Sequence, residues 1–264
     1  MPFLETCGCP LYYETHGQGP ALVFAHGLGG SHLAWWQQVP HFRGHYTCVT
    51  FDHRGFGLSR EAGGGLGPDA FVDDLAALVD HLHLTDVRLV AQSMGGWTCL
   101  GYALRYPDRV RALVMASTTG TLDDPETLAL FRTHGAAAPE AAVVARGIHP
   151  ACGERMAGEQ PALHFLYREM DALSLDLDKE AIRRRLIKMR TTPRAAVAAL
   201  RMPVLCLTGE EDIVIPPAAV GVFASIVPGA RLARVPDAGH SVYWERAATF
   251  NRLVDEFLAG AETR

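Results

Sequence analysis

The chain has 264 residues, 48% of which are hydrophobic, and a formal net charge of −5 at pH 7. A chain of this length can bury one sizeable core together with an inserted subdomain. The acidic balance disfavours nucleic acid as a partner, because phosphates require a basic protein face. No apolar stretch approaches the roughly 20 residues of a membrane span, and the first residues lack the pattern of a secretory signal. We therefore expect a cytoplasmic protein that binds neither nucleic acid nor a membrane.

The six cysteines are dispersed along the chain. Cys48, Cys99 and Cys206 lie within apolar runs, which is typical of buried free thiols rather than of a disulfide framework. The pair Cys7 and Cys9 has no second pair at zinc-site spacing, so a turn between two strands is the simpler interpretation. We expect no metal and no cofactor.

Short apolar runs rich in β-forming residues alternate with amphipathic helical stretches along most of the sequence. The expected strands are 21–25, 46–51, 87–92, 110–117, 202–209 and 230–236, and the clearest helices are 71–82, 98–106 and 250–258. Runs that are apolar on both faces and separated by helix-length connections indicate a mainly parallel, twisted sheet flanked by helices. The expected fold class is α/β.

This alternation stops from 119 to 198, where the sequence predicts helices and no strand. Acidic residues mark helix starts at Asp124 and Asp178, and the basic run 183–190 is most simply the solvated face of a helix. We expect a helical cap subdomain at 119–198, inserted after the sixth strand, and a core made of 1–118 and 199–264. Insertions at the carboxyl ends of parallel strands are where such folds bind ligands.

Ser93 stands directly after the apolar run 87–92 and directly before small residues that open a helix. A nucleophilic serine on a sharp turn between strand and helix needs this context, with small residues two positions before and after it. Ala91 and Gly95 occupy those positions. Taken alone, a serine at a glycine-rich helix start is also a common structural feature.

The segment around Ser93 resembles the nucleophile motif G-x-S-x-G of the α/β-hydrolase family, with Ala91 in place of the first glycine. The run HGLGG at 26–30 resembles the family's oxyanion loop. The resemblance implies that the backbone N–H groups of Leu28 and Met94 form the oxyanion hole. A glycine-rich connecting loop or a phosphate cradle is the alternative for 26–30, although the lysine and the spacing of a phosphate loop are missing.

The resemblance also implies a base and an orienting acid, in the chain order serine, acid, histidine. His240 stands before the last helix in the family's G-H context, and Asp212 follows the strand 202–209. Together with Ser93 they would form the catalytic triad. Glu210 and Glu211 are neighbouring carboxylates that we interpret as a solvated loop edge.

A further stretch at 51–59, FDHRGFGLS, resembles a loop typical of the smaller esterase, lactonase and C–C hydrolase members. Within it, Asp52 and Arg54 are expected to tie down the loop beneath the serine rather than to act in catalysis. Aromatic and apolar side chains are candidates for the substrate pocket, with ordinary core packing as the alternative. These pocket candidates are His26, Trp35, Trp36, Phe131, Phe165, Tyr167 and Val214.

The resemblance implies a serine hydrolase that cleaves a small carboxylic ester or lactone through an acyl-enzyme, with a small-molecule acyl substrate as its partner. C–C bond hydrolysis and cofactor-free perhydrolysis begin from the same triad and remain alternatives. A small-molecule receptor with slow turnover is an alternative from another functional class. The sequence indicates neither the natural substrate nor the oligomeric state.

Overall fold

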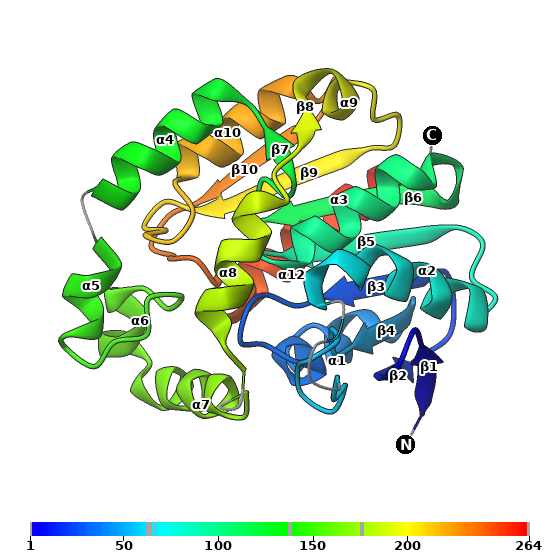
Figure 1. Ribbon diagram of the computed structural model, residues 1–264, viewed down its shortest axis with the longest axis horizontal. Helices are drawn as coiled ribbons and strands as arrows, with labels where there is room; N and C mark the ends of the chain where they lie inside the picture. Colours follow the sequence, from blue (N-terminus) through cyan, green and yellow to red (C-terminus); the bar gives the residue numbers. More distant parts are fainter. Residues whose placement is uncertain (1, 62–64, 66, 137–138, 175–176, 263–264) are drawn as a thin grey trace.

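The computed structural model describes residues 2–61, 65, 67–136, 139–174 and 177–262. Its main feature is an eight-stranded sheet with the order β1-β2-β4-β3-β5-β6-β9-β10 (Figure 1). β1 and β2 pair antiparallel, as do β2 and β4, and every later neighbour pairs parallel. The strands are β1 (Phe3–Thr6), β2 (Cys9–His16), β3 (Ala21–Ala25), β4 (Thr47–Phe51), β5 (Val87–Gln92), β6 (Val110–Ala116), β9 (Val204–Gly209) and β10 (Arg231–Val235).

Helices cover both faces of this sheet, which explains why the central strands are mostly apolar. Every residue of β3, β5 and β9 is buried, as expected for parallel strands between two helical layers. One face packs against α2 (Phe71–His81), α3 (Gly95–Arg105) and α10 (Pro217–Ile226). The other face packs against α1 (Val39–Phe42), α11 (Val242–Glu245) and α12 (Ala247–Glu262). The predicted mainly parallel α/β sheet flanked by helices is confirmed.

The chain between β6 and β9 is mostly helical. It contains α4 (Pro125–Ala136), α5 (Pro139–Val144), α6 (Glu154–Glu159), α7 (Pro161–Ala172), α8 (Lys179–Lys188) and α9 (Arg194–Ala198). In Figure 1, α5, α6 and α7 lie to one side of the sheet, whereas α4 runs beside α10. The expected helix starts are present, because Asp124 accepts a hydrogen bond from the Thr127 N–H at 3.0 Å and Asp178 from the Ala181 N–H at 2.8 Å.

One expectation for this segment is wrong, because it does contain strand pairing. β7 (Leu122–Asp123) and β8 (Thr192–Pro193) pair parallel and join the start of the helical segment to its end. A strand of two residues has no room for the alternation by which strands are recognised in a sequence. The sequence alone therefore gave no indication of this pairing.

The described residues also include three short 3₁₀ helices, η1 (His32–Trp35), η2 (Gly67–Ala70) and η3 (Pro107–Arg109). Within the residues that the structure describes, every helix is too short or too polar to cross a membrane.

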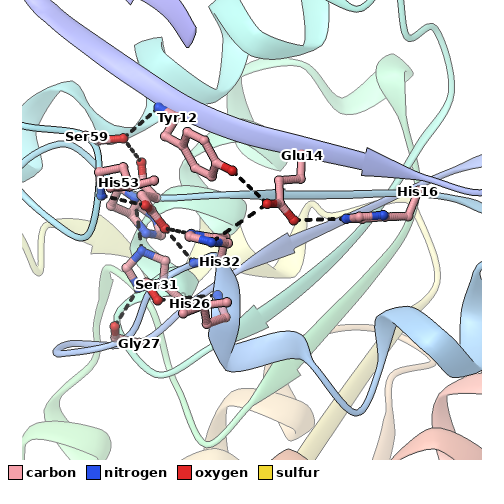
Figure 2. A network of polar contacts seen from close by, with 12 residues as sticks. Tyr12, Glu14, His16, His26, Gly27, Ser31, His32, His53 and Ser59 are labelled. Atoms are coloured by element: carbon pink, nitrogen blue, oxygen red, sulfur yellow. Dashed lines mark hydrogen bonds and ion pairs between the residues drawn. The ribbon is translucent and has the colours of Figure 1, made fainter. Parts of the chain in front are cut away.

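The loop that follows β4 is held by buried polar contacts (Figure 2). The Asp52 carboxylate accepts hydrogen bonds from the backbone N–H of His32 at 2.5 Å and of Leu58 at 2.8 Å. Ser59 donates to the Asp52 carbonyl at 2.8 Å and accepts from the Tyr12 N–H at 2.8 Å. Asp52 thus connects β2, the loop after β3 and the loop after β4, in the structural role that the sequence indicated.

Arg54 has an equally structural role in the same loop. Its buried guanidinium donates to both carboxylate oxygens of Asp74 on α2, at 2.6 and 2.5 Å, and to Glu61 at 2.8 Å. Two carboxylates compensate the buried charge and offset part of its desolvation cost.

Candidate active site

Ser93 occupies the sharp turn between β5 and α3, and its backbone is in the left-handed region with φ +49°. An L-residue with a side chain rarely adopts this conformation, so neighbouring contacts must impose it. The Ser93 N–H donates to the carbonyl of Ala116 at the end of β6 at 3.0 Å, and the Ser93 carbonyl accepts from the Gly96 N–H at 2.9 Å. The turn is therefore fixed at both ends.

The residues two positions from Ser93 are small because β3 passes directly beside them. A Cβ on Gly95 would lie 2.2 Å from the carbonyl oxygen of Ala25, so only glycine fits there. Ala91 pairs with Ala25 on one side and Met115 on the other and is fully buried. A methyl group fits at position 91, which explains why the turn tolerates alanine in place of the motif's first glycine.

His240 and Asp212 form a buried pair at the carboxyl end of the sheet. His240 lies in the loop after β10 and Asp212 in the loop after β9, and His240 Nδ1 is 2.9 Å from Asp212 Oδ2. The exposed fractions of the two residues are 4% and 3%. The other carboxylate oxygen, Oδ1, accepts from the backbone N–H groups of Val214 at 2.8 Å and Ile215 at 2.9 Å. A carboxylate only accepts, so it assigns the ring proton to Nδ1 and leaves Nε2 as an acceptor.

The alternative acids near Asp212 point elsewhere. Glu211 pairs with Arg155 of α6 at 2.6 Å, and Glu210 is exposed. Only Asp212 of these three carboxylates contacts His240, because its side chain is turned inward by the two amide hydrogen bonds.

Glu245 is a further buried carboxylate at the site, and the sequence analysis missed it. Its oxygens accept from the backbone N–H groups of Gly239 at 2.8 Å and Ser241 at 3.0 Å, which flank His240 in the chain. Burial raises its pKa above the usual range, although these amide hydrogen bonds act in the opposite direction. An acidic residue in the first turn of α11, bonding back to the N–H before the helix, resembles half of a capping box. This pattern is the sequence signal by which Glu245 could have been found.

The loop at 26–30 contacts the Ser93 turn. A Cβ on Gly27 would lie 3.2 Å from the Cβ of Ser93 and 2.0 Å from Oε1 of Gln92, so the loop backbone lies against both side chains. Leu28 and Met94 follow Gly27 and Ser93 directly. Within the described part of the chain, neither of their backbone N–H groups has a protein acceptor, so both amides are free to donate to a ligand.

A cavity of about 500 Å³ opens between this end of the sheet and the helical segment. Ser93, His240, Leu28 and Met94 all line it. Of the predicted pocket side chains, Phe131 of α4, Tyr167 of α7 and Val214 also line it. Tyr167 accepts a hydrogen bond from the Ser241 hydroxyl at 3.1 Å, which joins the helical segment to the His240 loop. Among the described residues, no three His, Cys, Asp or Glu side chains gather so as to hold a metal ion.

The sequence matches the family model described as alpha/beta hydrolase fold over residues 20–247, which is most of the chain. This chain belongs to the alpha/beta hydrolase family. The matched region includes residues 28, 93, 212 and 240.

The names of the relatives of this chain indicate different reactions. It is 30% identical over 262 residues to the 2-hydroxymuconate semialdehyde hydrolase of Pseudomonas sp. (strain CF600), a match that covers 93% of this chain and 89% of that protein. The structure of Est816, described as an N-acyl homoserine lactone degrading enzyme, has a TM-score of 0.78 at 26% identity and covers 97% of this chain and 100% of that one. A thermophilic esterase from Thermogutta terrifontis has a TM-score of 0.76 at 26% identity, with 96% and 94% covered.

Four side chains that the sequence suggested for the substrate pocket lie outside the cavity lining, so these four predictions are wrong. Trp35 is fully buried in the core, where it packs on Phe24 and Tyr243. Trp36 and Phe165 face solvent, with exposed fractions of 45% and 63%. The fourth side chain, His26, is fully buried at the start of the loop 26–30.

His26 is a neutral structural histidine whose two ring nitrogens are both used (Figure 2). Nδ1 lies 2.8 Å from the carbonyl of Gly27, and Nε2 accepts from the His53 N–H at 3.0 Å. A second proton on the ring would break the bond from His53. Burial lowers the pKa of His26 to about 4, and burial also lowers the pKa of His53 well below its usual range.

Because the fold lowers the pKa of His26 and of His53, we expect the free energy of unfolding to decrease as the pH falls below neutrality. The unfolded chain takes up a proton on each histidine near pH 6.5, whereas folded His26 does so only near pH 4, so the stabilisation is present above pH 6.5 and is lost towards pH 4. For His26 the full decrease in the free energy of unfolding is about 3 kcal/mol. Urea unfolding of the wild type and of His26→Asn between pH 6.5 and 4.5 measures this effect, and the variant's slope should be shallower by up to about 1.4 kcal/mol per pH unit.

His45→Asn is the matched control, since this histidine is exposed, and it should keep the wild-type slope. Equal slopes for the wild type and His26→Asn would contradict the assignment of His26 as a buried neutral residue.

Proposed function

We propose that this protein is a serine hydrolase that cleaves a small carboxylic ester or lactone through an acyl-enzyme formed on Ser93. One observation carries the proposal: a serine in a strained turn and a histidine paired with a buried carboxylate border the same cavity. A serine hydroxyl becomes a competent nucleophile when a base is positioned to accept its proton, and the base needs a third group to orient it.

In the first half-reaction, Ser93 Oγ attacks the substrate carbonyl carbon while its proton passes to His240 Nε2. Asp212 stabilises the imidazolium that forms and keeps the ring in the required orientation. The N–H groups of Leu28 and Met94 donate to the carbonyl oxygen as it becomes an oxyanion. His240 then returns the proton to the leaving oxygen, the C–O bond breaks and the acyl group remains on Ser93.

In the second half-reaction, His240 takes a proton from water, and the resulting nucleophile attacks the acyl carbon. Collapse of this intermediate releases the carboxylic acid and restores the Ser93 hydroxyl. In a lactone, the leaving alcohol stays attached to the acid, so a single ring-opened product forms. Amide donors that are fixed before the reaction cost no reorganisation during it, and removing one such donor typically lowers kcat by about 10²–10³-fold.

C–C bond hydrolysis is the second candidate, and the 30% identity to a semialdehyde hydrolase is the observation that favours it. We place ester or lactone cleavage first, because the structures of a lactone-degrading enzyme and an esterase match almost the whole chain, with TM-scores of 0.78 and 0.76.

The proposal predicts that Ser93→Ala abolishes turnover without unfolding the protein. The purified wild type should hydrolyse 4-nitrophenyl acetate or butyrate, or δ-valerolactone, and the variant should lose at least about 10⁴-fold in kcat. Circular dichroism and the melting temperature confirm that the variant is folded. Equal turnover by both proteins would refute the role of Ser93.

Two further results of the same assay would redirect the assignment. Turnover of a vinylogous diketone without any ester or lactone turnover would indicate C–C hydrolysis. A ligand-dependent melting shift with little product would indicate a receptor.

The acid is tested separately by Asp212→Asn. This change removes the charge that orients His240, and we expect kcat to fall by about 10³-fold or more. Glu211→Gln is the matched control at the adjacent position and should leave kcat within about threefold, because Glu211 pairs with Arg155 at the surface. A comparable loss in both variants would mean that the orienting acid is misassigned.

A further inference from the structure

Arg190 stands just after α8, with its guanidinium between two aromatic rings at the cavity wall. Its central carbon is 4.7 Å from the ring centre of Trp97 and 4.4 Å from that of Phe131. One of its nitrogens donates to the Thr119 hydroxyl at 2.8 Å. Arg190, Trp97 and Phe131 all line the cavity that Ser93 borders. The sequence favours a solvated face for the basic run 183–190, and Arg183 and Arg190 depart from this expectation because both line the cavity.

No carboxylate compensates this cation within the part of the chain that the structure describes. Two fully buried arginines do have such partners, since Arg54 pairs with Asp74 and Arg88 pairs with Glu262, each at 2.5 Å. Burial lowers the pKa of Arg190 to about 10, so the group is still charged at neutral pH. Ring faces attract a cation but satisfy none of its N–H donors. Arg190 is only partly buried, but a guanidinium that is partly removed from water and has no counter-charge still costs stability, which points to a use in ligand binding.

The cavity lining as a whole is biased towards positive charge, although the chain is acidic. Four cations line it, Arg132, Lys179, Arg183 and Arg190, against the carboxylates Glu140 and Asp171. Both carboxylates already have partners, because Asp171 pairs with Lys179 at 2.7 Å and Glu140 with Arg183 at 4.0 Å. The surplus positive charge therefore resides on Arg190, at the wall, and on Arg132.

The platform that carries Arg190 is tied to the nucleophile. Trp97 is on the first turn of α3, four residues after Ser93, and its ring nitrogen donates to the Leu186 carbonyl of α8 at 2.9 Å. This bond fixes the ring in place and joins α8 to α3. An anionic group on Arg190 would therefore sit at a set distance from the carbonyl that Ser93 attacks.

We propose that Arg190 binds a carboxylate on the acyl part of the substrate, so that the natural substrate is an acidic ester or lactone, a half-ester of a dicarboxylic acid in the simplest case. Guanidinium and carboxylate match as planar, two-point partners, and a desolvated site strengthens that contact. This inference rests on the proposed hydrolase function and adds the substrate class to it.

The test compares acidic and neutral esters of matched length. The acidic series is monoethyl succinate, glutarate and adipate, and the neutral series is ethyl butyrate, pentanoate and hexanoate. Ethanol release measures kcat/KM for both series. We expect the wild type to prefer the acidic ester at one chain length by at least about 10-fold, and Arg190→Gln to reduce that preference by about 10- to 100-fold. Arg190→Lys keeps the charge without the two-point contact and should give an intermediate preference.

Arg184→Gln is the matched control, because Arg184 is an exposed arginine of α8 that pairs with Glu180 at 3.8 Å and does not line the cavity. It should keep the wild-type preference. A wild type without a preference for acidic esters would overturn the inference and leave the hydrolase function intact. An equal fall on both series in Arg190→Gln and Arg190→Lys would overturn it as well, since Arg190 would then only join α8 to α3.

Binding of glutarate separates this inference from the proposed function. Calorimetric titration should detect glutarate binding to the wild type and to Arg184→Gln, with at least a 10-fold weaker affinity in Arg190→Gln and an intermediate one in Arg190→Lys. This result would support the anion site even if no ester were hydrolysed, in which case the hydrolase proposal alone would fail. Absence of glutarate binding to the wild type, or equal affinity in all variants, would overturn the anion site.

Discussion

The left-handed backbone of Ser93 is the constraint on which the rest of the site depends. The conformation is unfavourable for a serine, and it persists because β6 accepts the Ser93 N–H while β3 passes close enough to require glycine at position 95. Both contacts come from strands of the buried parallel sheet. The core therefore does more than stabilise the fold, because its packing holds one hydroxyl at the edge of a cavity.

The remaining site groups are fixed by buried hydrogen bonds rather than by strain. Asp212 uses one carboxylate oxygen for two backbone amides and the other for His240, and Glu245 holds the amides on either side of that histidine. Each buried carboxylate is thus satisfied, as it must be in a low-dielectric interior. Arg190 departs from this rule. Its charge is left without a carboxylate partner in the described structure, and this departure is what connects the helical segment to substrate recognition.

The sequence predicted the sheet because strands depend on local patterns, whereas Asp212 and His240 were proposed because their motifs resemble those of the family. Fully apolar runs identify strands buried on both faces, and small residues around Ser93 reflect a close backbone approach. The cavity wall depends on which face of each helix turns inward, and a side chain such as Phe165 looks the same in sequence whether it faces solvent or substrate. Arg190 was missed for the same reason, since its ring contacts lie far away in the chain and it has no carboxylate partner among the described residues. Glu245 contacts Gly239 and Ser241 nearby in the chain, and its role depends on how that loop folds.

The most direct test of the central claim, that the strained Ser93 is an activated nucleophile, is covalent labelling by a fluorophosphonate. Attack of the serine oxygen on phosphorus displaces fluoride and leaves a stable adduct that peptide mass spectrometry locates. The account predicts one adduct per chain, on the peptide that contains Ser93, and its loss when the protein is unfolded before exposure. A native protein that stays unlabelled, or one labelled at another residue, would contradict it.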